Sequence, residues 1–322
     1  MRRVLPLLIA VAVGGGNAHG AEPAAYPARP IRLVVPFAPG GAVDVPARLL
    51  GAKMSELAQQ QVVIDNRGGA GGVVGTELVA RAAGDGYTLL LHSATIAYEP
   101  ALRAKLPYDA LKDLAPISIT GATPNLLVVH PAFFARSARD LVQLAKQKPG
   151  AVNFGTGGVG SSSHLAVELF RNLAGVTFNH VPYKGAGPAL IEVIAGQIDF
   201  MIATMPSAVP HVRSARVRAL GISTLKRSAE LPEVPTIAES GVANFDVTMW
   251  YGVLAAAGTP QPLVMKLHGA VNRALRAPEI NERLLAEGSE PSGILPDEFS
   301  AFIKNELTRW APVIRASGAK AD

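Results

Sequence analysis

The sequence predicts an α/β fold in two domains, each with a sheet covered by helices. Short apolar segments alternate with amphipathic ones along most of the chain, which is typical of a parallel sheet packed against helices. A glycine loop with the spacing Phe-x-x-Gly-Gly occurs twice, at Phe37 and at Phe154. Two apolar segments, 125–130 and 245–255, can carry the chain between the domains and form a hinge.

Length and composition limit the class of protein. The chain has 322 residues, enough for two domains of ~100–200 residues each. Its hydrophobic content of 49% can fill two cores, and its basic residues are scattered, which argues against a nucleic-acid partner. The formal charge of +5 becomes 5 − 2 = +3 when Arg2 and Arg3 leave with a leader. The sequence contains no cysteine, so disulfides, thiolate metal sites and a cysteine nucleophile are excluded.

Residues 1–20 are predicted to be a signal peptide. Arg2 and Arg3 precede an apolar run, and Ala18-His19-Gly20 resembles a cleavage site, so the mature chain is expected to begin at Ala21. The run is too short to cross a bilayer as a stable helix. We therefore expect a soluble protein in a bacterial periplasm.

The first domain is predicted to contain three strands that end at one edge of its sheet. The strands are expected at 31–35, 61–65 and 87–92. A glycine turn at 66–72 opens a helix to about residue 83, and Ser93 and Thr95 follow the third strand. Ligands collect at the carboxyl ends of parallel strands. The first helix, 44–60, is expected to bury one face, made of Val45, Leu49, Leu50, Met54 and Leu57.

The loop from Phe37 to Gly41 is predicted to bind a small anion without a lysine. Glycine lets the backbone approach a ligand closely, and the first turn of the next helix offers unpaired N–H groups and a partial positive charge. For one such loop alone, a plain turn capped by Asp44 is the simpler interpretation. A second loop with the same spacing, in another domain, suggests that the two domains close around one ligand.

The remaining elements are predicted from periodicity and turn residues. Ser137 and Asp140 form a capping box that starts a helix to residue 148. The segment 114–130 reads as two apolar runs broken at 120–124. Further strands are expected at 152–154, 179–182, 198–203 and 219–223, and further helices at 164–174, 188–195, 262–276, 278–287 and 296–314.

The second glycine loop is rich in hydroxyl donors. Thr156 and the serines 161–163 can each donate or accept a hydrogen bond, and one serine is expected to serve only as the helix cap. Lys184 is the best-placed cation, although a plain surface lysine fits equally well. The Gly155-x-Gly157-x-x-Gly160 pattern also fits a dinucleotide fingerprint, but no acidic residue stands ~20 positions later for the ribose.

An enzyme is disfavoured by the motifs. A serine hydrolase requires a Gly-x-Ser-x-Gly elbow, which the sequence does not contain. Ser163 and His164 are neighbours on a helix and do not face each other. The seven histidines show no metal-ligand spacing. We therefore expect neither a catalytic centre nor a metal or cofactor.

Seven motifs in one order resemble the Bug family, the substrate-binding receptors of tripartite tricarboxylate transporters. The resemblance covers the whole mature chain. Its motifs are Pro36 to Asp44, Asn66-Arg67, Asp85 to Thr88, Ser161 to Leu165, Pro182 to Gly185, Leu231 to Thr236 and Trp250 to Gly252.

The resemblance implies two Rossmann-like α/β domains, as in periplasmic binding proteins, with a ligand cleft between them and a two-strand hinge. Domain 1 would comprise residues 21–124 and 250–322, and domain 2 residues 125–249. By the same resemblance, the protein would be a monomer that delivers a small carboxylate to a membrane permease. A membrane sensor that reads the same closed complex is the alternative partner.

The site residues that the resemblance implies come from both glycine loops and their surroundings. They are Phe37, Ala38, Pro39, Gly40, Gly41, Asp44, Ser93, Thr95, Thr156, Gly157, Gly160, Ser161, Ser162 and His164, with Tyr183, Lys184, Thr204 and Ser207 at the margin. Two departures from the family stand out. Ala42-Val43 is less polar than in many relatives. Ala203-Thr204 stands where some relatives carry an acidic residue, so a ligand without an amino group is expected.

Overall fold

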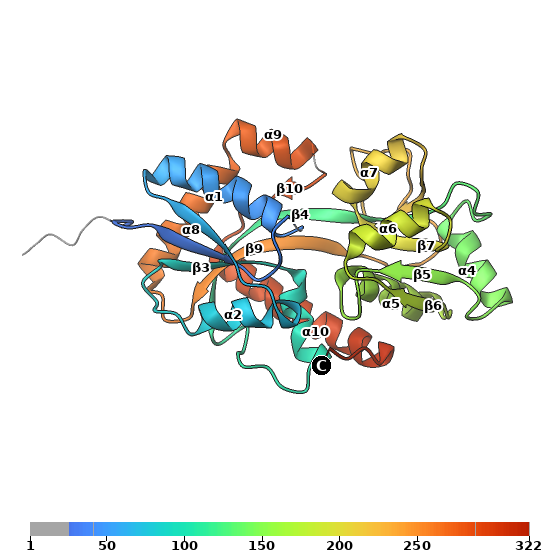
Figure 1. Ribbon diagram of the computed structural model, residues 1–322, viewed down its shortest axis with the longest axis horizontal. Helices are drawn as coiled ribbons and strands as arrows, with labels where there is room; N and C mark the ends of the chain where they lie inside the picture. The colour runs from blue at the N-terminus through green and yellow to red at the C-terminus, as the bar shows by residue number, and fades with distance from the viewer. Residues whose placement is uncertain (1–25, 41, 287, 322) are drawn as a thin grey trace, which may run out of the picture.

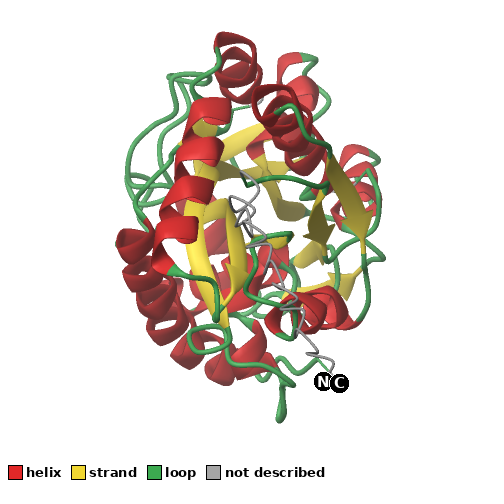
Figure 2. Ribbon diagram, turned by 90° about the vertical axis from the view of Figure 1, so that its left-hand side faces the viewer, coloured by secondary structure: helices red, strands yellow, loops and turns green. Residues whose placement is uncertain are grey.

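The computed structural model describes residues 26–40, 42–286 and 288–321. The predicted signal peptide and Gly41 lie outside this part of the chain. Within it, ten strands form one mixed sheet in the order β2-β1-β3-β9-β4-β7-β5-β6, and β8 and β10 pair with β4 off this path. The sheet is enclosed on both sides by helices (Figure 2). The predicted α/β class is confirmed.

The first lobe is built on three parallel strands. β1 (Ile31–Val35) lies between β2 (Val62–Asn66) and β3 (Thr88–Ser93), and β9 (Thr248–Ala256) runs antiparallel to β3. Because the three strands are parallel, the loops that follow them meet at one edge, as predicted. These strand bounds differ from the predicted ones by no more than three residues.

The second lobe repeats this arrangement. β5 (Asn153–Thr156) pairs in parallel with β6 (Asn179–Pro182) and β7 (Phe200–Thr204). β8 (Arg218–Ile222) is antiparallel to the long strand β4. The loops after β5, β6 and β7 therefore also share one edge.

β4 (Leu114–Val129) is one continuous strand of 16 residues, so the break predicted at 120–124 is wrong. Its first part pairs with β9, and its last part pairs with β7 and β8. Two register shifts opposite β9, between Pro116 and Ser118 and between Ile119 and Gly121, absorb the local irregularity. Residues 120–124 are typical of a turn, but they stay in the strand because other strands pair with β4 on both sides and bury it.

Helices cover both faces of the first lobe (Figure 1). α1 (Asp44–Ala58), α8 (Gln261–Leu275) and α9 (Pro278–Ala286) lie on one face, and α2 (Val73–Ala80) and α10 (Pro296–Ser317) lie on the other. No helix among these or the other described segments combines the length and apolar composition that a bilayer crossing requires.

The predicted apolar face of α1 is partly wrong. Val45 and Leu57 are 43% and 44% exposed, whereas Ala47, Leu50 and Met54 are buried. The helix packs its small residues closely on the sheet, and a Cβ atom on Gly51 would lie 2.8 Å from the Ile64 side chain. Ala47 and Gly51 complete the buried face beside Leu50 and Met54, and a search for large apolar residues does not detect these two small ones.

The second lobe also has helices on both faces. α4 (Ala138–Gln147) and α5 (Ser162–Ala174) cover one face, and α6 (Ala186–Ile194) and α7 (Met205–Arg213) cover the other (Figure 1). Alternate residues of β4 serve the two cores, as strand geometry requires. The sequence analysis missed α7, which carries Pro206 in its first turn and Pro210 inside.

Short elements complete the described chain. They are two 3-10 turns, Ala70–Gly72 and Ala94–Ala97, the single-turn helix α3 (Glu99–Leu102) and the short strand β10 (Glu290–Pro291).

The chain passes between the lobes beside Ser223. The Ser223 N–H donates to the Asn125 carbonyl oxygen at 2.9 Å, and the Asn125 N–H donates to Ser223 Oγ at 2.7 Å. The Val247 N–H donates to the Ser223 carbonyl oxygen at 2.8 Å. One buried serine thus ties the outgoing strand, β4, to the segment that returns into β9.

Candidate functional site

The first loop, between β1 and α1, is held in shape by Asp44. As a whole residue, Asp44 is 1% exposed. Its Oδ2 accepts a hydrogen bond from the Gly40 N–H at 2.7 Å, and its Oδ1 accepts one from Asn66 Nδ2 at 2.9 Å. Gly40 has a φ of +76°, a conformation that glycine adopts without strain. The carboxylate therefore faces the loop itself, while Ala38, Pro39 and Gly40 are exposed.

Arg48 is a member of this network that the sequence analysis missed. Its Nε donates to Asp44 Oδ2 at 2.8 Å, and its Nη2 donates to Asn66 Oδ1 at 3.1 Å. Burial alone would raise the pKa of Asp44, but the hydrogen bonds from Arg48, Gly40 and Asn66 outweigh it and hold this pKa below its ordinary value. The i, i+4 spacing of an aspartate and an arginine on a helix was the available signal.

Phe37 packs behind the loop against a buried histidine. Its ring meets that of His92 edge-on, with centroids 5.3 Å apart. Gly72 closes this contact, because a Cβ atom there would lie 3.0 Å from His92 Nε2 and 3.3 Å from Phe37 Cζ. Burial lowers the pKa of His92 to about 4, so the ring is neutral at physiological pH. Phe37 thus contributes to the support of the loop.

Ser93 and Thr95 follow β3 at the same edge. Ser93 Oγ and Thr95 Oγ1 lie 2.9 Å apart and share a hydrogen bond. Ser93 is 4% exposed and Thr95 is partly exposed. Of the two hydroxyl groups, that of Thr95 is the more accessible from solvent.

The second loop, between β5 and α5, uses the same backbone device as the first. Gly160 also has a φ of +76°, and its N–H donates to His164 Nδ1 at 3.1 Å. In each loop, the acceptor lies four residues after the glycine, in the first turn of the following helix. The sequence spacing had paired Gly40 with Gly157, whereas this hydrogen bond pairs Gly40 with Gly160.

His164 is a buried, neutral acceptor. Its ring stacks on that of His180, with centroids 4.2 Å apart and an interplanar angle of 11°. Burial, followed by the charges of His180 and Arg171, lowers the pKa of His164 to about 4. Because Nδ1 accepts from Gly160, the ring hydrogen is assigned to Nε2, which lies 3.6 Å from Glu168 Oε1. His164 therefore positions the loop, and its Nδ1 is already engaged.

Thr156 is also turned inward. It is fully buried, and its Oγ1 lies 2.6 Å from His180 Nε2 and accepts a hydrogen bond from the Gly158 N–H at 3.2 Å. Both polar partners belong to the second lobe. The hydroxyl group of Thr156 therefore stabilises the loop from behind.

The three serines have different roles. Ser161 caps α5, because its Oγ accepts from the His164 N–H at 3.3 Å and donates to the Gly158 carbonyl oxygen at 2.7 Å. The structure thus confirms that one of the three serines caps the helix. Ser163 Oγ accepts from the Gly157 N–H at 3.0 Å. Among the described contacts, the Ser162 hydroxyl has no internal partner, and this residue is partly exposed.

The marginal residues lie beside the second loop or after β7. The Tyr183 N–H donates to the Thr156 carbonyl oxygen at 3.0 Å, which places the turn of Tyr183 and Lys184 against the loop. Lys184 is exposed, and no ion pair to it occurs in the described part of the chain. Thr204 and Ser207, at the start of α7, share a hydrogen bond of 3.0 Å between their hydroxyl groups.

The second loop touches the first lobe. A Cβ atom on Gly160 would lie 2.9 Å from Leu102 Cδ1, on α3. A second contact between the lobes joins Met205, at the start of α7, to Gly288. The structure thus places the second loop at the boundary between the lobes.

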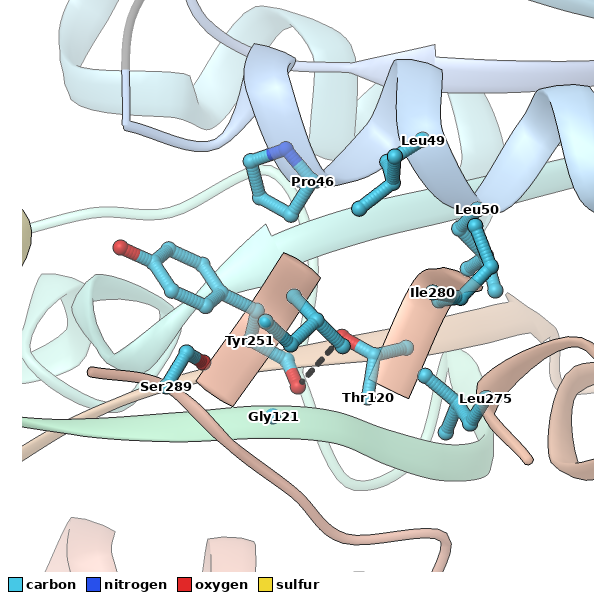
Figure 3. Close-up of a pocket in the computed structure, with 10 residues that line it drawn as sticks. Pro46, Leu49, Leu50, Thr120, Gly121, Tyr251, Leu275, Ile280 and Ser289 are labelled. Atoms are coloured by element: carbon cyan, nitrogen blue, oxygen red, sulfur yellow. Dashed lines mark hydrogen bonds between the residues drawn. The ribbon is translucent and has the colours of Figure 1, made fainter. Parts of the chain in front are cut away.

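A cavity inside the first lobe is too small for a solute. It has a volume of about 10 Å³, which is room for roughly one water molecule. Figure 3 shows Thr120 Oγ1 donating to the Tyr251 carbonyl oxygen at 3.2 Å beside the apolar side chains that line it. The lining residues are Pro46, Leu49, Leu50, Thr120, Gly121, Tyr251, Leu275, Ile280, Leu284 and Ser289. Within the described residues, no group of side chains could hold a metal ion.

Residues 46–319 match the TctC family, described as the tripartite tricarboxylate transporter family receptor. The chain belongs to this family. Protein BugT of Bordetella pertussis is 40% identical over 322 residues, covering 99% of both chains. The TctC family consists of periplasmic substrate-binding receptors and not of enzymes, which confirms the expected class.

Solved structures of TctC relatives share the fold. The Rhodopseudomonas palustris protein Rpa4515 with adipate has a TM-score of 0.83 at 34% identity, covering 92% of this chain and 99% of that one. MatC of the same organism, with bound malate, has a TM-score of 0.80 at 34% identity, covering 90% and 100%. The periplasmic binding protein BugD has a TM-score of 0.80 at 33% identity, covering 92% and 99%.

Proposed function

We propose that this TctC receptor captures a small carboxylate between its two lobes and presents it to a tripartite tricarboxylate-type permease. The observation that carries the proposal is the paired loop geometry. Each lobe presents a glycine loop before a helix N-terminus, and each loop is fixed by an acceptor in the first helical turn. Helix N-termini favour anions. The adipate and malate named with two relatives support the ligand class.

The ligand would contact the groups that the loops leave accessible. On the first lobe these are the exposed residue Ala38, with its backbone N–H, and Thr95, because Pro39 has no N–H and the Gly40 N–H donates to Asp44. On the second lobe they are Ser162 and Lys184. Asp44, Thr156 and His164 would act indirectly, because their polar atoms hold the loops. Ala203 and Thr204 offer no carboxylate to an ammonium group, which favours a ligand without an amino group.

Binding would close the two lobes about the crossing strands. The proposed domains are residues 21–124 with 250–322, and residues 125–249, which meet near Ser223. A ligand stabilises the closed form only by as much as it binds that form better. The permease would then recognise the closed surface.

A thermal-shift screen tests the proposal. The mature chain, residues 21–322, is unfolded and refolded to remove any bound ligand, then heated with mono-, di- and tricarboxylates and their matched amides. A ligand present at ~100 times its Kd adds ~2.7 kcal/mol to the free energy of unfolding. We expect a shift of several degrees with at least one carboxylate and none with its amide. Equal shifts with both, or none with any carboxylate, would contradict the proposal.

A further inference from the structure

The first loop contains a charge that opposes its proposed ligand. Asp44 is a buried carboxylate bonded to the Gly40 N–H, within the loop that would meet a carboxylate. Two negative charges in one site repel each other. The second loop avoids this problem, because its corresponding acceptor, His164, is a neutral ring.

We propose that Arg48 compensates the charge of Asp44 and thereby allows the first loop to accept a carboxylate ligand. The inference rests on the proposed function and adds a residue to it. Arg48 is a positioning and charge-compensating residue, since its partners are Asp44 and Asn66.

The geometry fits this role. The Arg48 guanidinium contacts Asp44 Oδ2 through Nε and Asn66 Oδ1 through Nη2, so one planar group joins the end of β2 to the start of α1. A lysine, with a single charged nitrogen, cannot reproduce this fork. The side chain of Arg48 is 54% exposed, whereas that of Asp44 is 2% exposed. The cation therefore lies on the solvent side of the buried charge.

Three variants separate charge from structure. Arg48→Gln leaves Asp44 uncompensated, Asp44→Asn leaves Arg48 uncompensated, and the double variant removes both charges. Asparagine keeps an oxygen that can accept from Gly40. We expect the affinity for adipate or malate, by calorimetry, to fall about tenfold or more in Arg48→Gln and to recover in the double variant. Asp44→Asn should bind the carboxylate at least as tightly as the double variant.

The control variant is Arg81→Gln. Arg81 pairs with Glu77 at 2.8 Å with the same i, i+4 spacing, but on the surface of α2. It should bind as the wild type does. If Arg48 had only a structural role, both single variants would lose affinity and the double variant would lose more. That outcome, or unchanged affinity in Arg48→Gln, would overturn the proposal.

A measurement without ligand separates this inference from the proposed function. The pKa of Asp44, followed by NMR, should be below its ordinary value in the wild type and higher in Arg48→Gln. An unchanged pKa would show that Arg48 does not compensate Asp44. If the pKa rises as expected but the wild type binds no carboxylate, the charge pairing stands, and the proposed function and the ligand role of Arg48 both fail.

Discussion

His164 shows how a single side chain can fix the shape of a loop. Its Nδ1 accepts a hydrogen bond from the Gly160 N–H, and its ring stacks on that of His180. The family resemblance placed His164 among the expected ligand contacts, and this stays a prediction. Its burial and its tautomer depend on β6, which is distant in the sequence, so the pattern around His164 could not reveal them.

Two substitutions of His164 should show whether it stabilises the loop by accepting the Gly160 hydrogen bond or only by filling space with its ring. In His164→Asn, Oδ1 can still accept from the Gly160 N–H. In His164→Leu, that donor loses its partner, and we expect a loss of about 1–3 kcal/mol in the free energy of unfolding. Urea denaturation of both variants checks this. A leucine variant as stable as the asparagine variant would contradict the assigned role.

Two buried histidines should make stability depend on pH. Burial lowers the pKa of His92 and His164 from the ordinary 6.5 to about 4. Between these values the unfolded chain binds more protons than the folded one, so stability should fall as the pH decreases from 6.5 towards 4. His92→Gln should reduce this slope in urea denaturation at several pH values. The same slope in the variant would exclude a contribution from His92.

At the scale of elements, β4 and α7 show where sequence patterns fail. The strands bracketing the glycine loops were predicted within a few residues, because apolar runs and glycine turns mark them locally. The continuity of β4 depends on pairing with β9, β7 and β8, which no local window contains. α7 has two prolines that conceal its helical pattern.

Helix α10 is joined to the sheet through Glu306. The indole N–H groups of Trp250, on β9, and Trp310, on α10, both donate to Glu306 Oε2 at 3.2 Å. Glu306 is 7% exposed. The Trp310 ring also packs against Tyr98, with centroids 4.9 Å apart. One carboxylate therefore links the returning strand to the C-terminal helix.

Removing this carboxylate should be costly. Glu306→Ala leaves two buried indole donors without their partner, and we expect a loss of about 2–4 kcal/mol in the free energy of unfolding. Glu306→Gln retains an acceptor oxygen and should lose less. Tryptophan fluorescence during urea unfolding measures both variants. Equal, small losses would show that the indole hydrogen bonds do not stabilise α10.

At the scale of the whole molecule, the two lobes resemble each other more in architecture than in sequence. Each has parallel strands whose loops share an edge, and each places a glycine with φ of +76° before a helix. The repeated Phe-x-x-Gly-Gly spacing indicated this relation, although it paired the wrong glycines. The i, i+4 spacing could have indicated the Asp44–Arg48 pair. The hydrogen bonds that both residues make with Asn66 emerge only when β2 is placed beside α1.

The crystal structure of the mature protein with the carboxylate that gives the largest thermal shift tests the central claim most directly. We expect the ligand between the lobes, with one carboxylate group at the exposed residue Ala38 of the first loop and contacts from Ser162 on the opposite loop. A ligand bound to one lobe only, or at a surface away from both loops, would contradict the account.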